Sequence, residues 1–392
     1  MGSPLTAEWA RPLTTLPRNP AALSIEDPGS VSTFSCCISE QCRAPLAGER
    51  DHVAAADGNS SATTEEPADD LVLALFVLCR LYTNNGPSGR LDPSAERGGA
   101  CSMANRETKA VGEDPRWWNK DTVAVVTGAN KGIGFEIARA LAKQGITTVL
   151  TARDEDRGKK AVEALKREGL DNVIFHPLDV QSEESSRNLA QWLSQNYGGI
   201  DILMNNAGVA KKDVNVENAD LVLGTNYYGV KQVTDALMPL LRNSTHDARI
   251  VVTGSRAGEL KGLQNNKFEE ELADREHITE AKTDAFMSDY ENGVKNGTWQ
   301  DGGFPARNTN YSVSKIAVNG YVGALANELS SRPEGQRIQV NSFCPGYTQT
   351  DMTDNKGNNT PEQGADTGVW LALQPPGAPS GKFWGERHEL AF

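Results

Sequence analysis

The chain has 392 residues, of which 38% are hydrophobic, and a formal net charge of −13. This length and apolar content suit one large α/β domain with additions. The acidity argues against nucleic acid or an anionic membrane as a partner, because such surfaces repel an acidic protein that lacks a concentrated basic patch. The apolar run Leu71–Cys79 is about half as long as a helix that crosses a bilayer, so no membrane span is expected.

Residues 1–115 are expected to form a largely disordered N-terminal extension, because they lack sustained periodicity and contain Pro/Gly/Ser/Ala-rich pieces. Met103 would be a plausible start for the compact domain. The extension carries no recognisable secretory or transit signal, so a cytoplasmic location is expected. Only Cys344 lies in the rest of the chain, which fits a reducing compartment. The other cysteines follow no zinc-ligand spacing, so no metal is expected at Cys36, Cys37, Cys42, Cys79 and Cys101.

Residues 116–392 alternate short apolar runs with segments of helical apolar spacing, beginning with a strand at Val123–Val126 and a helix at Phe135–Gln144. This alternation predicts an α/β, three-layer, doubly wound parallel sheet, a Rossmann fold, in which ligands bind at the carboxyl ends of the strands. The other predicted strands are Thr147–Thr151, Val173–Pro177, Ile200–Met204, Arg249–Thr253 and Ile338–Phe343. The other predicted helices are Gly158–Glu168, Glu183–Tyr197, Ala219–Leu241 and Tyr311–Ser331.

The turn after the first strand, Thr127–Gly134, reads TGANKGIG. Glycines at Gly128, Gly132 and Gly134 permit backbone conformations and close approaches that a β-carbon would block. A pyrophosphate can therefore lie on the N-terminus of the following helix. A turn that only packs helix against strand is the alternative, but the flanking strand and helix favour nucleotide binding.

Five features in a fixed order resemble the short-chain dehydrogenases/reductases. They are the glycine turn, Asp179, Asn205–Gly208, Ser255 and the Tyr311–Lys315 segment YSVSK. The resemblance covers about residues 122–392, and it is greatest to the monomeric carbonyl reductases and the plant menthone, neomenthol and salutaridine reductases. Each feature alone is weak evidence, but their shared order is specific.

The resemblance implies a catalytic group of Asn226, Ser255, Tyr311 and Lys315. Ser255 would donate a hydrogen bond to the substrate oxygen, Tyr311 would supply the proton, and Lys315 would also bind the nicotinamide ribose. Asn226 would position a water against the lysine. Tyr311 and Lys315 are four residues apart and share one helix face, so the ammonium and the oxidised nicotinamide are expected to lower the tyrosine pKa.

The resemblance also implies contacts with the rest of the cofactor. Asp179 would accept a hydrogen bond from the adenine amino group with help from the main chain of Val180, although a strand-end Asp can equally cap the next helix. Asn206 would hold both the sheet and the cofactor. The expected cofactor contacts are Gly128, Asn130, Lys131, Gly132, Ile133, Gly134, Arg153, Arg157, Asp179, Val180, Asn206, Tyr311, Lys315 and, at the nicotinamide carboxamide, Thr350.

The end of the second strand favours NADPH/NADP+. An NAD-selecting enzyme places an Asp or Glu there, and that carboxylate would repel the extra phosphate of NADP. This chain has Arg153, with Lys131 and Arg157 nearby, and guanidinium groups bind phosphate in a bidentate way. The alternative is that these are solvated charges beside a helix. Asp154 would take the selecting position if the alignment were one residue off.

Ser255 and Tyr311 are 56 residues apart, much farther than in most members of the family. The carbonyl reductases and the plant reductases resemble this chain in having such an insertion, which lies over the helix face that other members use to form tetramers. A helical insertion at about residues 259–306 is therefore expected, and with it a monomer. The insertion is also expected to wall the substrate pocket.

The expected activity is NADPH-dependent reduction of a ketone or aldehyde, or the reverse oxidation of a secondary alcohol, with hydride transfer from the nicotinamide and Tyr311 as proton donor. The partner is thus a small-molecule carbonyl or alcohol, which the sequence does not specify further. The closing stretch, residues 370–392, resembles the plant members. A non-catalytic NADP-binding regulatory protein is the alternative, and the complete set of catalytic residues argues against it.

Overall fold

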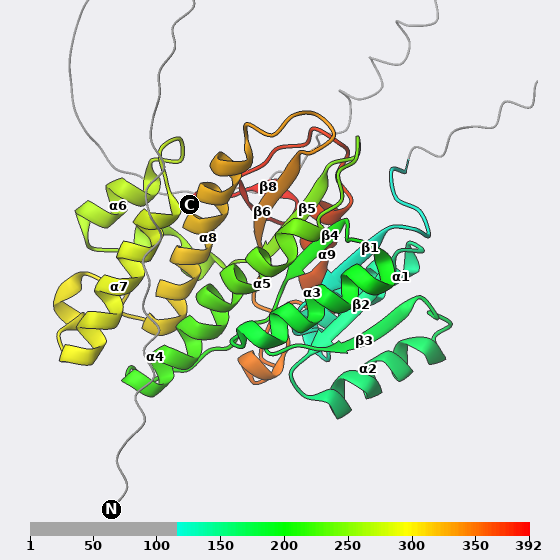
Figure 1. Ribbon diagram of the computed structural model, residues 1–392. Helices are drawn as coiled ribbons and strands as arrows, with labels where there is room; N and C mark the ends of the chain where they lie inside the picture. Colours follow the sequence, from blue (N-terminus) through cyan, green and yellow to red (C-terminus); the bar gives the residue numbers. More distant parts are fainter. Residues whose placement is uncertain (1–115) are drawn as a thin grey trace, which may run out of the picture. The chain divides into compact units, whose positions relative to one another are not determined.

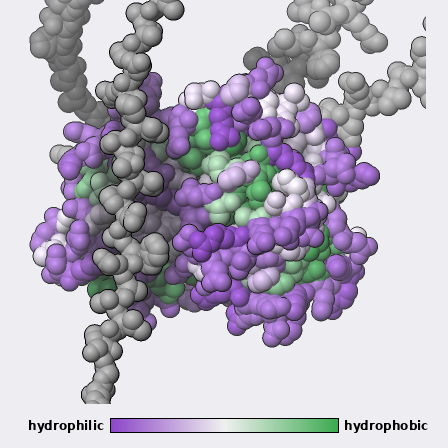
Figure 2. Space-filling view, in the orientation of Figure 1, coloured by the Kyte–Doolittle hydropathy of each residue, from purple (hydrophilic) through white to green (hydrophobic). Residues whose placement is uncertain are grey.

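The structure is a computed structural model that describes residues 116–392, which lie within one compact unit. The predicted disordered extension, with its five cysteines and the run Leu71–Cys79, lies outside the described residues. Figure 1 shows a central sheet with helices on both sides. The face seen in Figure 2 is mostly hydrophilic, with smaller hydrophobic areas. Between residues 116 and 392, no helix combines the length and apolarity needed to cross a membrane.

The sheet has eight strands in the order β3-β2-β1-β4-β5-β6-β7-β8. Every neighbouring pair in this sheet is parallel except β7 and β8. Inner strands such as β1 and β4 are buried along their whole length, because helices cover both faces. The strands are β1 Val123–Val126, β2 Thr147–Ala152, β3 Val173–Pro177, β4 Ile202–Asn205, β5 Ala248–Thr253, β6 Ile338–Cys344, β7 Phe383–Gly385 and β8 His388–Glu389.

Two hydrophobic cores lie on opposite faces of the sheet. Val123 and Val125 belong to the core beneath α3, α4, α5 and α8, whereas Ala124 and Val126 belong to the core beneath α1, α2 and α9. Successive side chains of a strand point to opposite faces, so β1 contributes to both cores. The helices outside the insertion are α1 Gly132–Lys143, α2 Glu155–Arg167, α3 Glu183–Tyr197, α4 Val216–Leu223, α5 Gly229–Leu237, α8 Thr309–Leu329 and α9 Pro361–Ala372.

The predicted fold class is confirmed, but one predicted helix is wrong. The range Ala219–Leu241 is not one α-helix: α4 ends at Leu223, a π-helical turn occupies Gly224–Tyr228, and α5 ends at Leu237. A π-turn adds a residue to one turn of a helix and is found mostly at functional sites. The elements α9, β7 and β8 are not among those predicted from the sequence.

The insertion between β5 and α8 is helical, as expected, and contains α6 Asn266–Ala273 and α7 Glu280–Asn296. In α7, Phe286, Met287 and Tyr290 are buried. Gly320 on α8 allows this close packing, since a β-carbon there would lie 2.7 Å from Cγ2 of Thr283. Because the sheet and the insertion enclose it from two sides, α8 is buried along most of its length.

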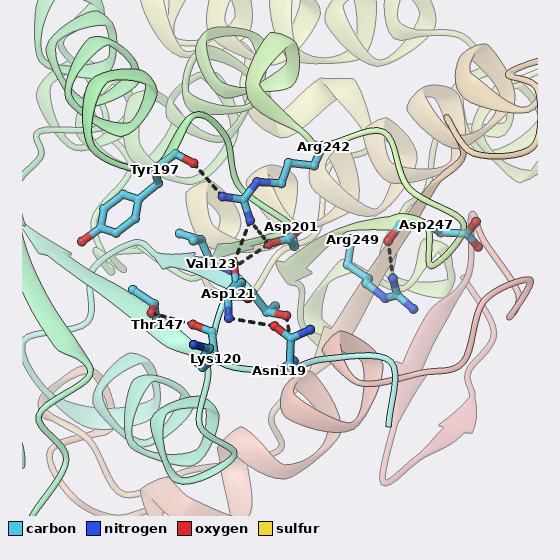
Figure 3. A network of polar contacts seen from close by, with 11 residues as sticks. Asn119, Lys120, Asp121, Val123, Thr147, Tyr197, Asp201, Arg242, Asp247 and Arg249 are labelled. Carbon is cyan, nitrogen blue, oxygen red and sulfur yellow. Dashed lines mark hydrogen bonds and ion pairs between the residues drawn. The ribbon is translucent and has the colours of Figure 1, made fainter. Parts of the chain in front are cut away.

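A polar network lies at the amino-terminal ends of the strands, opposite the carboxyl ends where ligands are expected (Figure 3). Asp201 accepts hydrogen bonds from Val123 N at 2.7 Å and from Arg242 Nη1 at 2.8 Å. Arg242 also donates to the Tyr197 carbonyl at 2.7 Å. The buried Arg249 guanidinium lies 3.7 Å from the centre of a ring of Trp117. These contacts join β1, β4 and β5 to the segment that precedes β1.

Candidate functional site

The strand order reverses between β1 and β4, because chain connections from β1 run to one side through β2 and β3 and then return to β4. Open α/β sheets bind ligands in the crevice at the carboxyl ends of the strands at such a switch point. The glycine turn follows β1 and the Asn205–Gly208 stretch begins at the end of β4. The structure therefore brings two of the predicted motifs to the switch point.

The glycine turn has the shape of an anion cradle. Gly128 and Gly132 have φ of 62° and 59°, values that L side chains rarely adopt. A β-carbon on Gly134 would lie 2.4 Å from Nδ2 of Asn206, so only glycine fits there. The helix that follows, α1, has no side-chain cap and no acidic residue in its first turn, which leaves its N-terminal N–H groups and positive dipole end available to an anion.

Asn206 is engaged with the glycine turn itself. Its Nδ2 donates to the carbonyls of Thr127 at 3.0 Å and Gly128 at 3.3 Å. Thr127 Oγ1 in turn accepts from the backbone N–H groups of Asn206 at 2.9 Å and Ala207 at 3.0 Å. Asn206 therefore holds the glycine turn to the end of β4 without a bound cofactor, which is the structural one of the two roles expected for it.

Asp179 does not cap the next helix, which resolves one alternative left open by the sequence. Ser182 is the N-cap of α3, and its hydroxyl accepts from Ser185 N. Asp179 Oδ1 accepts only from Gln181 N, at 3.1 Å, among the contacts of the described chain. The Val180 carbonyl accepts from Gln232 Nε2 at 2.8 Å, which ties the end of this loop to α5.

The cations near the end of β2 are placed differently from one another. Arg153 is exposed. Arg157 lies 3.3 Å from Asp154, whose side chain also caps α2 by accepting from the backbone N–H of Arg157. Asp154 therefore has a structural role at the start of α2. Lys131 pairs with Asp351 at 2.5 Å, and the charge of Arg157 also lowers the pKa of this carboxyl.

Asp351 lies beside the glycine turn and is not among the residues expected there from the sequence. It lies in the segment after β6, one residue beyond Thr350, and its partner Lys131 holds the pKa of this carboxyl below its usual range. Thr350 itself approaches the turn, since its Cγ2 lies 3.3 Å from the position of a β-carbon on Gly132. The segment after β6 thus touches the glycine turn at two adjacent residues. No local sequence pattern signals this contact, because Lys131 and Asp351 are 220 residues apart in the chain.

The Ser255 side chain lies near the Tyr311 hydroxyl and acts on its pKa. Ser255 follows β5, and Tyr311 lies in the first turn of α8. Burial raises the pKa of Tyr311 to about 12, although the side-chain hydrogen bond with Ser255 lowers it. In the protein alone, desolvation of the phenolate outweighs the effect of Ser255. The lowering expected from the ammonium together with the oxidised nicotinamide stays a prediction.

Lys315 is buried one helical turn after Tyr311. Its Nζ donates to the Thr253 carbonyl at 2.5 Å and lies 5.7 Å from the Tyr311 ring centre. Burial lowers the pKa of Lys315 to about 8. The amine is thus charged at neutral pH and loses its charge as the pH rises through this value.

Asn226 lies in the π-turn and is fully buried. Its side chain exchanges two hydrogen bonds with the Val209 backbone, at 2.8 Å and 2.9 Å, and donates to Ser314 Oγ at 3.0 Å. It therefore joins the loop after β4 to α8 next to Lys315. Cys344 at the end of β6 is buried, and its Sγ accepts from the backbone N–H groups of Arg256 and Gly346.

The sequence and the fold of the chain are similar to those of known proteins. A family model described as short chain dehydrogenase matches residues 122–267 and 303–361 and leaves most of the two-helix insertion unmatched. The chain is 40% identical over 270 residues to carbonyl reductase 1 (NADPH) of Mus musculus, covering 67% of this chain and 95% of that one. It is 37% identical over 306 residues to the (+)-neomenthol dehydrogenase of Arabidopsis thaliana, covering 71% and 99%.

A solved structure, that of salutaridine reductase from Papaver somniferum, is 36% identical with a TM-score of 0.63, and the match covers 67% of this chain and 99% of that one. The sequence matches thus span nearly the full length of these relatives. The family model matches more than half of the chain, and carbonyl reductase 1 is 40% identical to it over 67% of its length. The chain therefore belongs to the short-chain dehydrogenase/reductase family.

Proposed function

We propose that the protein is an NADPH-dependent oxidoreductase that reduces a ketone or aldehyde to an alcohol, or catalyses the reverse reaction, with Tyr311 as the proton donor. The observation that supports this most directly is the grouping of Ser255, Tyr311 and the buried Lys315, whose Nζ lies 5.7 Å from the Tyr311 ring centre. Carbonyl reductase 1 (NADPH) and (+)-neomenthol dehydrogenase are the relatives whose names indicate such an activity. The alternative of a non-catalytic regulatory protein gains no support from them.

The residues of the site fit NADPH. The glycine turn and the uncapped N-terminus of α1 would hold the pyrophosphate, and the exposed Arg153 would bind the additional phosphate. Asp179 would hold the adenine end, and Thr350 would contact the carboxamide. When bound, the nicotinamide supplies a hydride to the carbonyl carbon.

The protein's own groups would handle the proton. Ser255 and Tyr311 would both donate hydrogen bonds to the substrate oxygen, and the phenolic proton would pass to that oxygen as negative charge develops on it. With a pKa of about 12, Tyr311 is protonated at neutral pH and ready to donate. The ammonium of Lys315 would stabilise the phenolate that results, and it would bind the ribose hydroxyls.

Reduction should become slower as the pH rises through about 8, because Lys315 loses its charge there and no longer stabilises the phenolate. Oxidation of the alcohol product should instead become faster with increasing pH, because it needs deprotonated Tyr311. Initial rates in both directions across neutral and alkaline pH check this. A reduction rate that rises through the same range would contradict the assignment.

An apolar substrate is supported by exposed apolar side chains in the segment after β6 and at the start of α4. Tyr347 and Met352, in the segment after β6, are 53% and 46% exposed, and Val216 at the start of α4 is 43% exposed. A plant-type menthone- or neomenthol-like ketone, or another carbonyl compound, is the substrate class proposed. Terpenoid ketones, aromatic aldehydes and quinones, each followed by the loss of NADPH absorbance, test it, and no turnover with any of them would count against the proposal.

A monomer located in the cytoplasm completes the proposal. The insertion is bound to the face formed by α4, α5 and α8: Tyr227 donates to Asp284 at 2.7 Å, and Lys231 pairs with Asp284 at 2.7 Å and Glu280 at 2.6 Å. A second subunit would have to displace α7 to use this face. Light scattering should therefore give the mass of one chain, and a mass of two or four chains would overturn the prediction.

A further inference from the structure

Three side chains on one face of α8 contact the same short segment, Thr253–Gly258. Tyr311, Lys315 and Asn319 are four residues apart, so they lie in a row along the helix. Ser255 lies near the Tyr311 hydroxyl and lowers its pKa, and Lys315 Nζ donates to the Thr253 carbonyl at 2.5 Å. Asn319 Nδ2 donates to the Gly258 carbonyl at 3.3 Å. The segment is thus held to α8 by a hydrogen bond at each of its ends.

The far end of this segment fits closely against the helix. A β-carbon on Gly258 would lie 2.5 Å from the carbonyl carbon and oxygen of Lys315. A β-carbon on Gly254 would lie 2.6 Å from Oδ1 of Asn319. Glycine at both positions lets the backbone of the segment approach the row of side chains on α8.

Gly258 is linked directly to the catalytic serine. The turn Arg256–Gly258 is capped by Ser255, whose Oγ accepts from Ala257 N at 3.1 Å and whose carbonyl accepts from Gly258 N at 2.9 Å. A movement of Gly258 away from α8 therefore changes the position of the Ser255 hydroxyl.

Asn319 is an unusual residue for its place. It is fully buried, and its Oδ1 has no hydrogen-bond partner in the described part of the chain. A buried polar group with an unmade hydrogen bond is unfavourable, and an apolar side chain would avoid this. The hydrogen bond from its Nδ2 to Gly258 is the contact that only the amide supplies.

We propose that Asn319 is a positioning residue, which holds Gly258 against α8 and thereby keeps the Ser255 hydroxyl within hydrogen-bonding reach of Tyr311. This inference rests on the proposed function. The groups that face the Tyr311 hydroxyl are Ser255 from the segment after β5, Lys315 from its own helix and Cys344 from β6. Two of these groups are bonded to the turn Arg256–Gly258: Ser255 through Ala257 N and Gly258 N, and Cys344 through Arg256 N. Of the two, Ser255 is the one that lowers the tyrosine pKa.

The test is the pH profile of alcohol oxidation, which reports the deprotonation of Tyr311. Because the hydrogen bond from Ser255 lowers the tyrosine pKa, Asn319→Ala should move the profile to higher pH and lower kcat about tenfold. Ser255→Ala should move it in the same direction. If Asn319 acts through Ser255, the double variant should show little more than the Ser255→Ala effect.

Asn327→Ala is the matched control. Asn327 is on the same helix, and its Nδ2 donates to the Arg275 carbonyl at 2.8 Å, but it does not touch the segment Thr253–Gly258. Its profile should match that of the wild type. If Asn319→Ala does not fold, Gly258→Ala leaves the asparagine intact, displaces the same turn sterically, and should shift the profile in the same direction.

An Asn319→Ala enzyme with a lower rate but an unchanged profile would overturn the inference, and so would effects of Asn319→Ala and Ser255→Ala that simply add. Both results leave the proposed function intact. The absence of turnover in the wild type would instead contradict the proposed function itself, so the two failures are distinguishable.

Discussion

Replacing Tyr311 with Phe should lower turnover by about 10²–10⁴-fold while NADPH affinity stays nearly unchanged. The substitution removes the hydroxyl that lies near Ser255 and keeps the ring beside Lys315, so the packing of α8 is preserved. Turnover measured by NADPH absorbance and affinity measured by fluorescence titration check the two parts of this expectation.

Tyr197→Phe is a matched control for the loss of a phenolic hydroxyl. Tyr197 is the last residue of α3 and packs edge-on against Trp192. Its carbonyl is bonded to Arg242 at the amino-terminal ends of the strands, whereas the candidate site is at the carboxyl ends. Its variant should keep both turnover and affinity. A Tyr311→Phe enzyme that turns over normally would rule out Tyr311 as the proton donor, whereas a loss of NADPH binding would point to a structural role.

Arg153→Ala should raise the KM for NADPH about 10- to 100-fold and leave the KM for NADH almost unchanged. Among residues 116–392, Arg153 has no ion-pair partner, whereas Arg157 pairs with Asp154 and Lys131 pairs with Asp351. Arg153 is therefore the cation at the end of β2 that could bind a phosphate without giving up an ion pair.

The measurement is a comparison of the two cofactors with one carbonyl substrate. Arg167→Ala is the control, because Arg167 is exposed at the far end of α2 and contacts only the Glu163 carbonyl among the described residues. Equal effects of Arg153→Ala on NADPH and NADH would contradict the assignment and would make Arg153 a general surface charge.

Most of the sheet could be predicted because each strand is a short apolar run between clear turn signals. The first strand, Val123–Val126, is observed as predicted. By contrast, β7 and β8 have three and two residues and exist only through pairing with β6 and with each other. A pattern that short carries no periodicity, so the sequence does not specify it locally.

Two errors in the helices have different causes. The start of α9 carries a local signal, a Thr360/Gln363 capping box with Pro361 at the first position, which the sequence analysis overlooked. The π-turn at Gly224–Tyr228 has no such signal. The buried Asn226 within it is bonded to Val209 and Ser314, so the interruption depends on tertiary contacts that helical periodicity does not report.

The site residues were predictable as a set but not in their electrostatics. Motif order is enough to select Ser255, Tyr311 and Lys315, which the structure brings together. Their pKa values depend on burial, which raises that of Tyr311 and lowers that of Lys315. The pairing of Lys131 with Asp351 also escapes sequence analysis, because the two residues are far apart in the chain.

The transfer of hydride to a carbonyl carbon is the central claim, and isotope labelling tests it most directly. The protein is incubated with a carbonyl substrate and NADPH that is deuterated at the transferable position, and the alcohol is analysed by mass spectrometry. The account predicts one deuterium on the carbinol carbon for each NADPH consumed. NADPH that binds but is never consumed, whatever carbonyl is offered, would contradict it and would favour a regulatory protein.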